Sequence, residues 1–327
     1  MVSGIKQLIN KQYMLLAALG NYICDFKNHI KYCANYHDDK NLTKDMLRCR
    51  IMLIYHQLEK AQTYSIMKKD YGKEKIVELI RLTQLYFSRY GRDSVSLTSL
   101  GVINSHIRNP YSYKDDVIES KYNNLLNNVG IDTENLQLGG VILKTLKDIP
   151  HDNALLDFLK SRRSLRRYAN EKLTKEEIRT AIEYAMTAPS ACNRQSVRAH
   201  YYDNPDVIKD IVISQKSDIN WCLDAKGLFI ITGNRSLFRD YFERNQYMFD
   251  AGLFSMNLVL GLHNQGIGSC FKMAQKDKKI DKCTKEIAGI PSQEDICVLL
   301  LVGKYPHDEI ICAKSSRLDI EEVLMAH

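Results

Sequence analysis

Several sequence patterns that define common classes of enzyme are missing from this 327-residue chain. It has no C-x-x-C pair, which argues against a zinc ribbon and a thioredoxin-like redox motif. It has neither H-E-x-x-H nor G-x-x-x-x-G-K-[ST], the patterns of a helix-borne zinc protease and of a P-loop. The lone Gly266-Ile267-Gly268 is too short for a dinucleotide-binding fingerprint. No arrangement of a Ser-His-Asp triad or of metal ligands is found, so we expect no metal site.

The chain also lacks a long apolar run. No segment approaches the ~20 apolar residues that cross a membrane, so we expect no membrane association. The apolar stretch Met14–Leu19 is short and is not followed by a clear small-residue cleavage site, which predicts that there is no signal peptide. Nine cysteines, an odd number without such a peptide, predict reduced thiols and a cytoplasmic protein.

Composition is ordinary for a globular protein, with 45% hydrophobic and 26% charged residues. The length allows two domains and a large core. A net charge of +7 is mild and favours solubility and the attraction of anionic ligands. No basic stripe with exposed aromatic residues is evident, so we expect a small-molecule substrate and no nucleic-acid partner.

The most informative segment is Arg162-Arg163-Ser164-Leu165-Arg166-Arg167-Tyr168. It precedes a helix start signal in which Thr174 is the N-cap and Glu177 completes a capping box. Guanidinium groups fork onto phosphate oxygens and a serine hydroxyl donates one more hydrogen bond. The segment therefore predicts either a grip for a phosphate monoester or a solvated basic patch.

One helix later the chain reads Ala188-Pro189-Ser190-Ala191-Cys192-Asn193-Arg194-Gln195-Ser196. Pro189 ends the helix, and small and amide residues then predict an irregular loop. Backbone amides, a hydroxyl and carboxamides suit the polar edge of a planar heterocycle. Cys192 is interpreted as a small, partly buried filler, with a redox role as the alternative.

Taken together, the two segments resemble the nitroreductase family of FMN-dependent oxidoreductases, which carries R-x-S-x-R, a helix, and then A-P-S-x-x-N-x-Q. The resemblance runs from about Leu155 to the C-terminus and includes Asp250-Ala251-Gly252 and the strand Ile296–Gly303. The chain departs from the family where Ser196 replaces a common proline and where His263 and Asn264 replace small apolar residues. The family pattern does not cover the first 150 residues.

The resemblance implies FMN as the cofactor, NAD(P)H as the electron donor and an intertwined homodimer with FMN at its interface. It implies no catalytic side chain, because reduced FMN itself holds the hydride. The phosphate and ribityl end of FMN would be held by Arg162, Arg163, Ser164, Arg166, Lys314 and Arg317. The ring and ribityl hydroxyls would be held, partly from the partner subunit, by Pro189, Ser190, Ala191, Asn193, Gln195, Asn220, Met273 and Ala274.

The predicted fold class is α+β, a nitroreductase-like FMN fold with a mixed sheet flanked by helices, preceded by an all-helical N-terminal domain. We place the domains at 1–150 and 151–327. Periodicity predicts helices over 45–63, over 72–90 with Gly91 as its stop, and over 111–128. In the second domain it predicts strands over 199–203, 227–233, 268–273 and 296–303, and helices over 205–214, 238–264 and 277–288. The strand over 227–233 is apolar throughout, which predicts burial on both faces.

The long helix over 238–264 is apolar nearly all round. Its most regular stripe recurs at steps of four and three residues and consists of Phe249, Leu253, Met256, Leu260 and His263. Such a helix must be buried on all sides, either inside one subunit or at a subunit interface. The family resemblance favours the interface.

One string of the N-terminal half, Tyr55-His56-Gln57-Leu58-Glu59-Lys60, resembles an H-x-L-E-K string of nitroreductase-like proteins from bacterial polysaccharide gene clusters. His56 and Lys60 share a helix face at i, i+4, so both side chains can point at one ligand. The alternative is a solvated face with a local Glu–Lys pair.

Three hypotheses for function follow. The first is an FMN-dependent oxidoreductase that transfers a hydride from NAD(P)H to a nitroaromatic, a quinone or a pathway-specific compound. The second is a specialised flavoenzyme of bacterial polysaccharide or other biosynthesis, with the N-terminal domain as substrate lid. The third is a non-catalytic assembly protein with a vestigial flavin fold. The sequence alone does not identify the substrate, the choice of NADH or NADPH, or the pathway.

Overall fold

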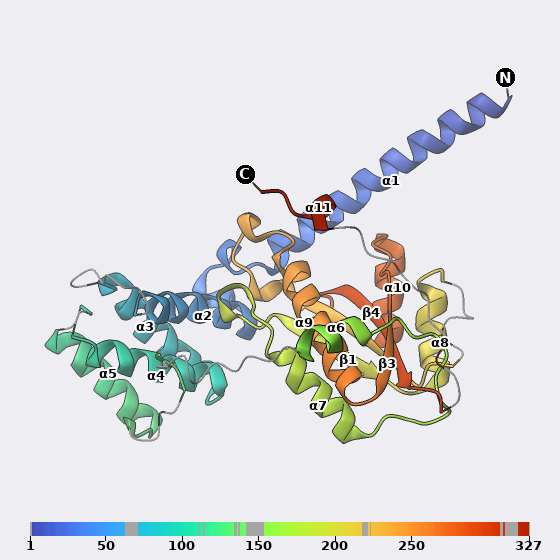
Figure 1. Cartoon of the computed structure of the whole chain (residues 1–327). Coiled ribbons are helices and arrows are strands. Elements are labelled where there is room, and N and C mark those ends of the chain that lie inside the picture. Colours follow the sequence, from blue (N-terminus) through green and yellow to red (C-terminus); the bar gives the residue numbers. More distant parts are fainter. Residues whose placement is uncertain are drawn as a thin grey trace.

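The computed structural model describes residues 2–62, 71–110, 112–113, 115–133, 136, 138–141, 154–217, 222, 224–307, 310 and 320–326. Figure 1 shows three parts: a long helix that projects from the rest of the molecule, a group of helices, and a part built around a β-sheet. The projecting helix is α1 (Val2–Tyr32). The expected domain boundary near residue 150 lies outside the described residues.

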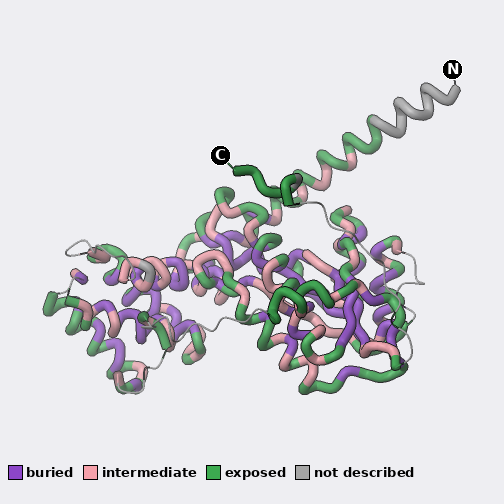
Figure 2. Tube along the Cα trace, in the orientation of Figure 1, coloured by how far each residue is buried: buried purple, intermediate pink, exposed green. Residues whose placement is uncertain are grey.

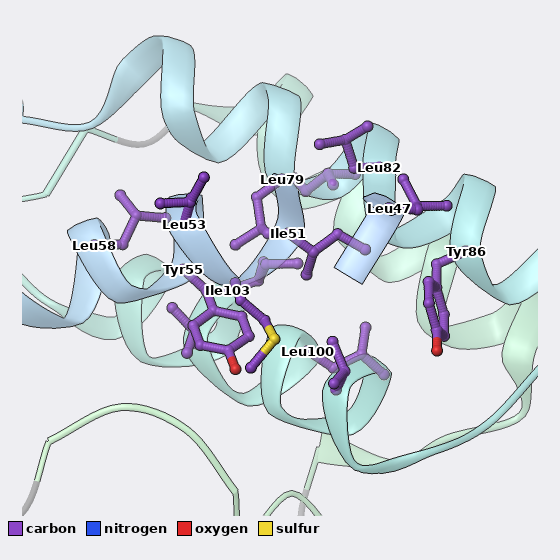
Figure 3. Packing of buried hydrophobic residues seen from close by; sticks show 14 of the residues in the cluster. Leu47, Ile51, Leu53, Tyr55, Leu58, Leu79, Leu82, Tyr86, Leu100 and Ile103 are labelled. Carbon is purple, nitrogen blue, oxygen red and sulfur yellow. The ribbon is translucent and has the colours of Figure 1, made fainter. Parts of the chain in front are cut away.

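The helical part consists of α2 (Lys44–Ala61), α3 (Lys73–Tyr90), α4 (Ser94–Arg108) and α5 (Asp116–Val129). Short 3₁₀ turns η1 (Ala34–Tyr36) and η2 (Asp39–Asn41) lead into it from α1. Its core forms because apolar residues at helical spacing on α2, such as Leu47, Ile51 and Leu58, face Leu79 of α3 and Leu100 of α4 (Figure 3).

The helix expected over 72–90 is confirmed. Gly91 ends it with a φ of 71°, and the Gly91 N–H donates to the carbonyl of Phe87 at 3.1 Å. The helix expected over 111–128 begins only at Asp116, where Asp115 provides the N-cap. Helix α4 was not predicted, although Asp93 and Ser96 form a capping box at its start. Helix α1 was not predicted either.

The sheet has four strands in the order β1 (Val197–Tyr202), β2 (Gly227–Asn234), β4 (Glu294–Lys304) and β3 (Ile267–Lys272). Each neighbouring pair is antiparallel, and a parallel bridge joins Ser164 to Ser269 at the β3 edge. All eight residues of β2 are buried, as expected for an apolar central strand. The α+β class is confirmed.

Helices cover both faces of the sheet. On one face lie α7 (Lys175–Met186) and α9 (Gln246–Asn264), which share a core with Phe229, Leu300 and Val302. On the other face lie α8 (Pro205–Ser214) and α10 (Lys278–Ala288). The shorter elements are α6 (Ala154–Ser161), α11 (Ile320–Val323), η5 (Ala191–Asn193), η7 (Arg235–Leu237) and η8 (Tyr241–Glu243).

The start of the long helix differs from its prediction. The helix begins at Gln246 rather than at Phe238, because residues 241–243 form a 3₁₀ turn and Asn245 takes a left-handed φ of 68°. Within one chain the helix is not buried on all sides, so burial inside one subunit is not observed and the subunit interface stays a prediction. Phe249 and Met256 of the predicted stripe are 63% and 41% exposed, so this stripe faces away from the sheet.

The helical part and the sheet part are packed together. Leu237 of η7 belongs to the buried core of the helical part, and Cys192 packs against that core. Figure 2 shows buried residues in both parts and a mostly exposed α1. Among the residues that the structure describes, no helix is both long and apolar enough to span a bilayer.

Candidate functional site

The arginine segment runs along the outer edge of β3. The Leu165 N–H donates to the carbonyl of Ser269 at 2.9 Å. Gly268 makes this close approach possible, since a Cβ at that position would lie 2.2 Å from Cδ2 of Leu165. The segment therefore has a fixed place beside β3.

His263, which departs from the family pattern, positions the start of this segment. One ring nitrogen lies 2.7 Å from Oγ of Ser161, and the other lies 2.8 Å from the hydroxyl of Tyr305. Burial, and the positive charge of Arg162, lower the pKa of His263 below its usual value. The two contacts fix the orientation of the ring beside the start of the segment.

Arg162 has a buried hydrogen-bond donor that lacks an acceptor in the described structure. Its Nε is buried and has no hydrogen-bond partner among the described residues. Arg163 differs, because its guanidinium donates to the carbonyls of Lys160 and Arg162. Ser164 is partly buried and Arg166 is exposed. A buried donor without a partner costs about 1–3 kcal/mol, so the site fits an anionic acceptor such as a phosphate.

The loop after α7 adopts a strained backbone. Cys192, Asn193 and Gln195 have φ angles of 51°, 51° and 50°, in the left-handed region that residues other than glycine rarely adopt. Each such residue costs on the order of 1 kcal/mol and persists only where its surroundings hold it in place.

Asp250, at the start of α9, provides part of that support. Its carboxylate is buried and accepts from the Ala191 N–H at 3.2 Å and from Oγ of Ser196 at 3.4 Å. Within the loop, the Gln195 N–H donates to Oγ of Ser190 at 3.0 Å. The bond from Ser196 to Asp250 uses the serine that replaces a common proline of the family pattern.

Arg194 provides the remaining support for the loop backbone. Its role was not predicted from the sequence. Its side chain is 1% exposed and forks onto both oxygens of Glu243 at 2.8 and 2.9 Å. Its Nε donates to the carbonyl of Ala191 at 3.0 Å, and its guanidinium lies 4.6 Å from the ring centre of Phe238. Its Nη1 also lies 3.9 Å from Sγ of Cys49 on α2. The loop is thus locked between the sheet part and the helical part.

The outer surface of the loop remains accessible. Asn193, Gln195 and Pro189 are exposed, and Ser190 and Ala191 are partly buried. A cavity of about 300 Å³ lies against the loop, with apolar walls from α7, β1 and α9 and with Ser190, Gln195 and Asp250 among its lining residues. Such a cavity suits part of a planar aromatic ligand.

Met273 and Ala274 directly follow β3. Met273 is 73% exposed and Ala274 is buried. Met273 stands four positions after Ser269, which is about 13 Å along a strand. The arginine segment and Met273 therefore lie along the edge of one strand.

The arginine segment and the loop do not meet within one chain. The loop is bonded to Asp250 near the start of α9, and the arginine segment is bonded through Ser161 to His263 near its end. From position 250 to position 263 a helix rises about 20 Å. Antiparallel packing of α7 on α9 keeps this separation, with Asn257 bonded to Thr187 at 2.9 Å and Gln265 bonded to the Glu177 carbonyl at 3.2 Å.

Other predicted residues cannot be placed in this site. Asn220, Lys314 and Arg317 lie outside the described residues, as does the side chain of Lys60. Glu59, in the same string as His56, is half-buried and accepts from the Gly140 N–H at 3.0 Å. Burial raises the pKa of this carboxyl. No group of three or more His, Cys, Asp or Glu side chains in the described ranges is placed to hold a metal ion.

Known proteins resemble the half of the chain that holds these segments. The model of the nitroreductase family matches residues 159–219. A protein of Archaeoglobus fulgidus with the name NADH dehydrogenase/NAD(P)H nitroreductase is 26% identical over 156 residues, which cover 47% of this chain and 86% of that protein.

Solved structures resemble the same half. An FMN-dependent nitroreductase from Clostridium difficile is 21% identical with a TM-score of 0.45, and the match covers 53% of this chain and 99% of that one. A nitroreductase-like protein from Desulfovibrio desulfuricans, solved in complex with FMN, is 21% identical with a TM-score of 0.44 over 54% and 98% of the two chains. The family match includes both the arginine segment and the loop, so the part of the chain that holds them is similar to the nitroreductase family.

Proposed function

We propose that this protein is an FMN-dependent oxidoreductase that passes electrons from NAD(P)H to an organic acceptor, of the nitroaromatic, quinone or pathway-specific class. The observation that carries the proposal is Arg162, whose buried Nε lacks a partner in the described structure and which lies in the segment that the family model matches. A bound phosphate oxygen supplies the missing acceptor. FMN, when bound, supplies two-electron chemistry at its ring.

The residues of this chain act by holding and orienting the cofactor. Arg162, Ser164 and Arg166 hold the phosphate end, with Lys314 and Arg317 as further candidates from the C-terminal tail. Arg163 has a lesser part in this proposal, because its guanidinium already bonds to local carbonyls. Met273, which is exposed and directly follows β3, and Ala274 would lie beside the ring.

The loop forms the other wall of the site. Ser190, Asn193 and Gln195 offer a hydroxyl and two carboxamides for the polar edge of the ring or the ribityl hydroxyls, while Pro189 and Ala191 shape the backbone around them. Since Asp250 and Arg194 fix the backbone, little reorganisation is needed when the ring binds. The apolar wall beside the loop restricts water near the ring.

The separation of the two segments supports a homodimer. Within one chain they lie at opposite ends of α9, whereas the loop of one subunit can meet the arginine segment of another across a two-fold axis. The outward stripe of α9, with Phe249 and Met256 exposed, provides an apolar surface for this contact.

The test is the identity and stoichiometry of the bound flavin. Purified protein is expected to be yellow, to release FMN on heat denaturation, and to oxidise NADH or NADPH when a quinone or nitroaromatic is supplied. Release of FAD would contradict a site built around one phosphate grip. Protein that neither carries FMN nor takes it up would leave the non-catalytic assembly hypothesis.

A further inference from the structure

Helix α1 exposes an unusual amount of apolar surface. It projects away from the rest of the molecule over most of its length (Figure 1). Its large apolar side chains are mostly exposed, including Tyr13, Met14, Leu15, Leu16, Leu19, Tyr22, Ile23 and Phe26. A helix that is apolar over much of its circumference is stable in water only when something covers it.

The other described residues of this chain leave that surface exposed. The hydrogen bonds between α1 and the sheet part join polar groups: the Tyr32 hydroxyl lies 2.8 Å from Oγ of Ser292, and Asn21 accepts from the Lys278 N–H at 2.7 Å. Asp25 pairs with Arg235 at 3.2 Å. A cavity of about 840 Å³ lies between this part of α1 and α10. The helix is therefore tethered along its second half, and the apolar side chains named above stay exposed in the described structure.

The exposed residues include a regular seam. Leu15, Leu19, Tyr22 and Phe26 follow one another at steps of four, three and four residues and are between 56% and 74% exposed. This is the spacing with which one helix packs against another. The seam thus fits a helical surface of matching shape.

The exposed area of the seam is large enough to mark an interaction site. Its four side chains, of up to ~200 Å² each and about two-thirds exposed, present at most roughly 500 Å². Exposed patches beyond a few hundred Å² usually mark an interaction site, and the proposed α9 contact would supply the remainder of the ~800 Å² that a stable protein–protein contact buries on each partner.

We propose that α1 is an assembly arm whose seam packs against a second copy of this chain. In a two-fold assembly the same surface occurs twice and is self-complementary, so one seam supplies the cover for the other. The arm would add to the proposed α9 contact, because both surfaces are apolar and exposed on the same chain. It contains none of the residues proposed to bind FMN, so it goes beyond the proposed function.

The test compares two double variants by sedimentation velocity over a range of concentrations. Leu15→Glu/Leu19→Glu places charges in the seam and is expected to weaken self-association roughly a hundredfold or more. Val117→Glu/Ile213→Glu changes two exposed apolar residues on α5 and α8 and is expected to leave self-association unchanged. Circular dichroism checks that both variants keep the wild-type helix content.

Equal dissociation constants for the wild type and the seam variant would overturn the inference. If that equality comes with a flavin-bearing dimer, the proposed function stands and only the arm fails. Wild-type protein that is monomeric at every concentration would overturn both the arm and the shared site. Binding of the wild type, but not of the seam variant, to phosphatidylcholine–phosphatidylglycerol vesicles would replace the second copy with a membrane surface.

Discussion

Replacing Arg194 by methionine tests whether the loop is held by a buried ion pair. The substitution keeps an unbranched side chain and removes the fork onto Glu243 together with the bond to the Ala191 carbonyl. Glu243 would keep the bond from the Arg239 N–H at 2.6 Å but lose its charged partner. Breaking one side of a buried pair costs about 3–5 kcal/mol, which is the expected loss in the free energy of unfolding.

The effect on flavin is expected to be separable from the effect on stability. Three left-handed residues store about 3 kcal/mol of backbone strain, which is comparable to the stabilisation lost with the ion pair. Without Arg194 the loop can relax to a right-handed backbone and turn Asn193 and Gln195 away. Arg194→Met/Glu243→Leu removes both charges and is expected to recover most of the stability but not the flavin occupancy.

Urea unfolding monitored by circular dichroism gives the free energies, and flavin absorbance relative to protein gives the occupancy. Arg81→Met is the matched control, because Arg81 also forks onto a carboxylate at 2.7 Å but is 47% exposed. Such an exposed pair contributes about 0–1 kcal/mol. Equal losses in the free energy of unfolding for the Arg194 and Arg81 single variants would refute the stabilising role of the buried Arg194–Glu243 ion pair. Full flavin occupancy in Arg194→Met/Glu243→Leu would refute the link between this ion pair and the cofactor.

Three further predictions concern the cofactor, the interface and pH. Arg162→Ala should weaken FMN binding by about 1.5–3 kcal/mol with only partial rescue by lysine, and unchanged occupancy under dilute conditions would rule out the phosphate site. Leu253→Asp should place an unpaired charge in the α9 contact and abolish dimers and flavin together, as measured by sedimentation and absorbance; monomers that keep their flavin would contradict the shared site. The folded-state pKa of His263 lies below the unfolded value of about 6.5, so the unfolded chain binds the proton first and stability falls as pH drops through that value. His263→Gln should flatten this part of the pH profile of the free energy of unfolding, and an unchanged profile would count against the assignment.

Local patterns predicted most of the second half of the chain. The helix over 205–214 and the buried strand beginning at Gly227 have the expected bounds within one residue. Proline, an Asn cap and a continuous apolar run act over a few residues, so the sequence contains their signal. The start of α9 was wrong because the left-handed Asn245 and the turn before it depend on tertiary contacts.

The candidate site was predictable only in part. Motif order located the arginine segment and the loop, but nothing in the local sequence distinguishes Arg194, which is buried, from Arg162 and Arg166. Its partner Glu243 is 49 residues away, and Cys49 lies in the other half of the chain. Such long-range packing has no sequence period. The helix α1 was missed for a related reason, since most of its described apolar side chains are exposed and pack into no core of the described structure.

The most direct test of the shared flavin site is complementation between two defective subunits. One variant carries Arg162→Ala/Arg166→Ala and the other carries Asn193→Ala/Gln195→Ala, each with a different affinity tag, so that mixed dimers can be isolated after unfolding and refolding together. If each site combines an arginine segment from one subunit with a loop from the other, each homodimer should bind little FMN, whereas a mixed dimer should regain a single intact site and bind one flavin. Mixed dimers as empty as both parent homodimers would contradict the account.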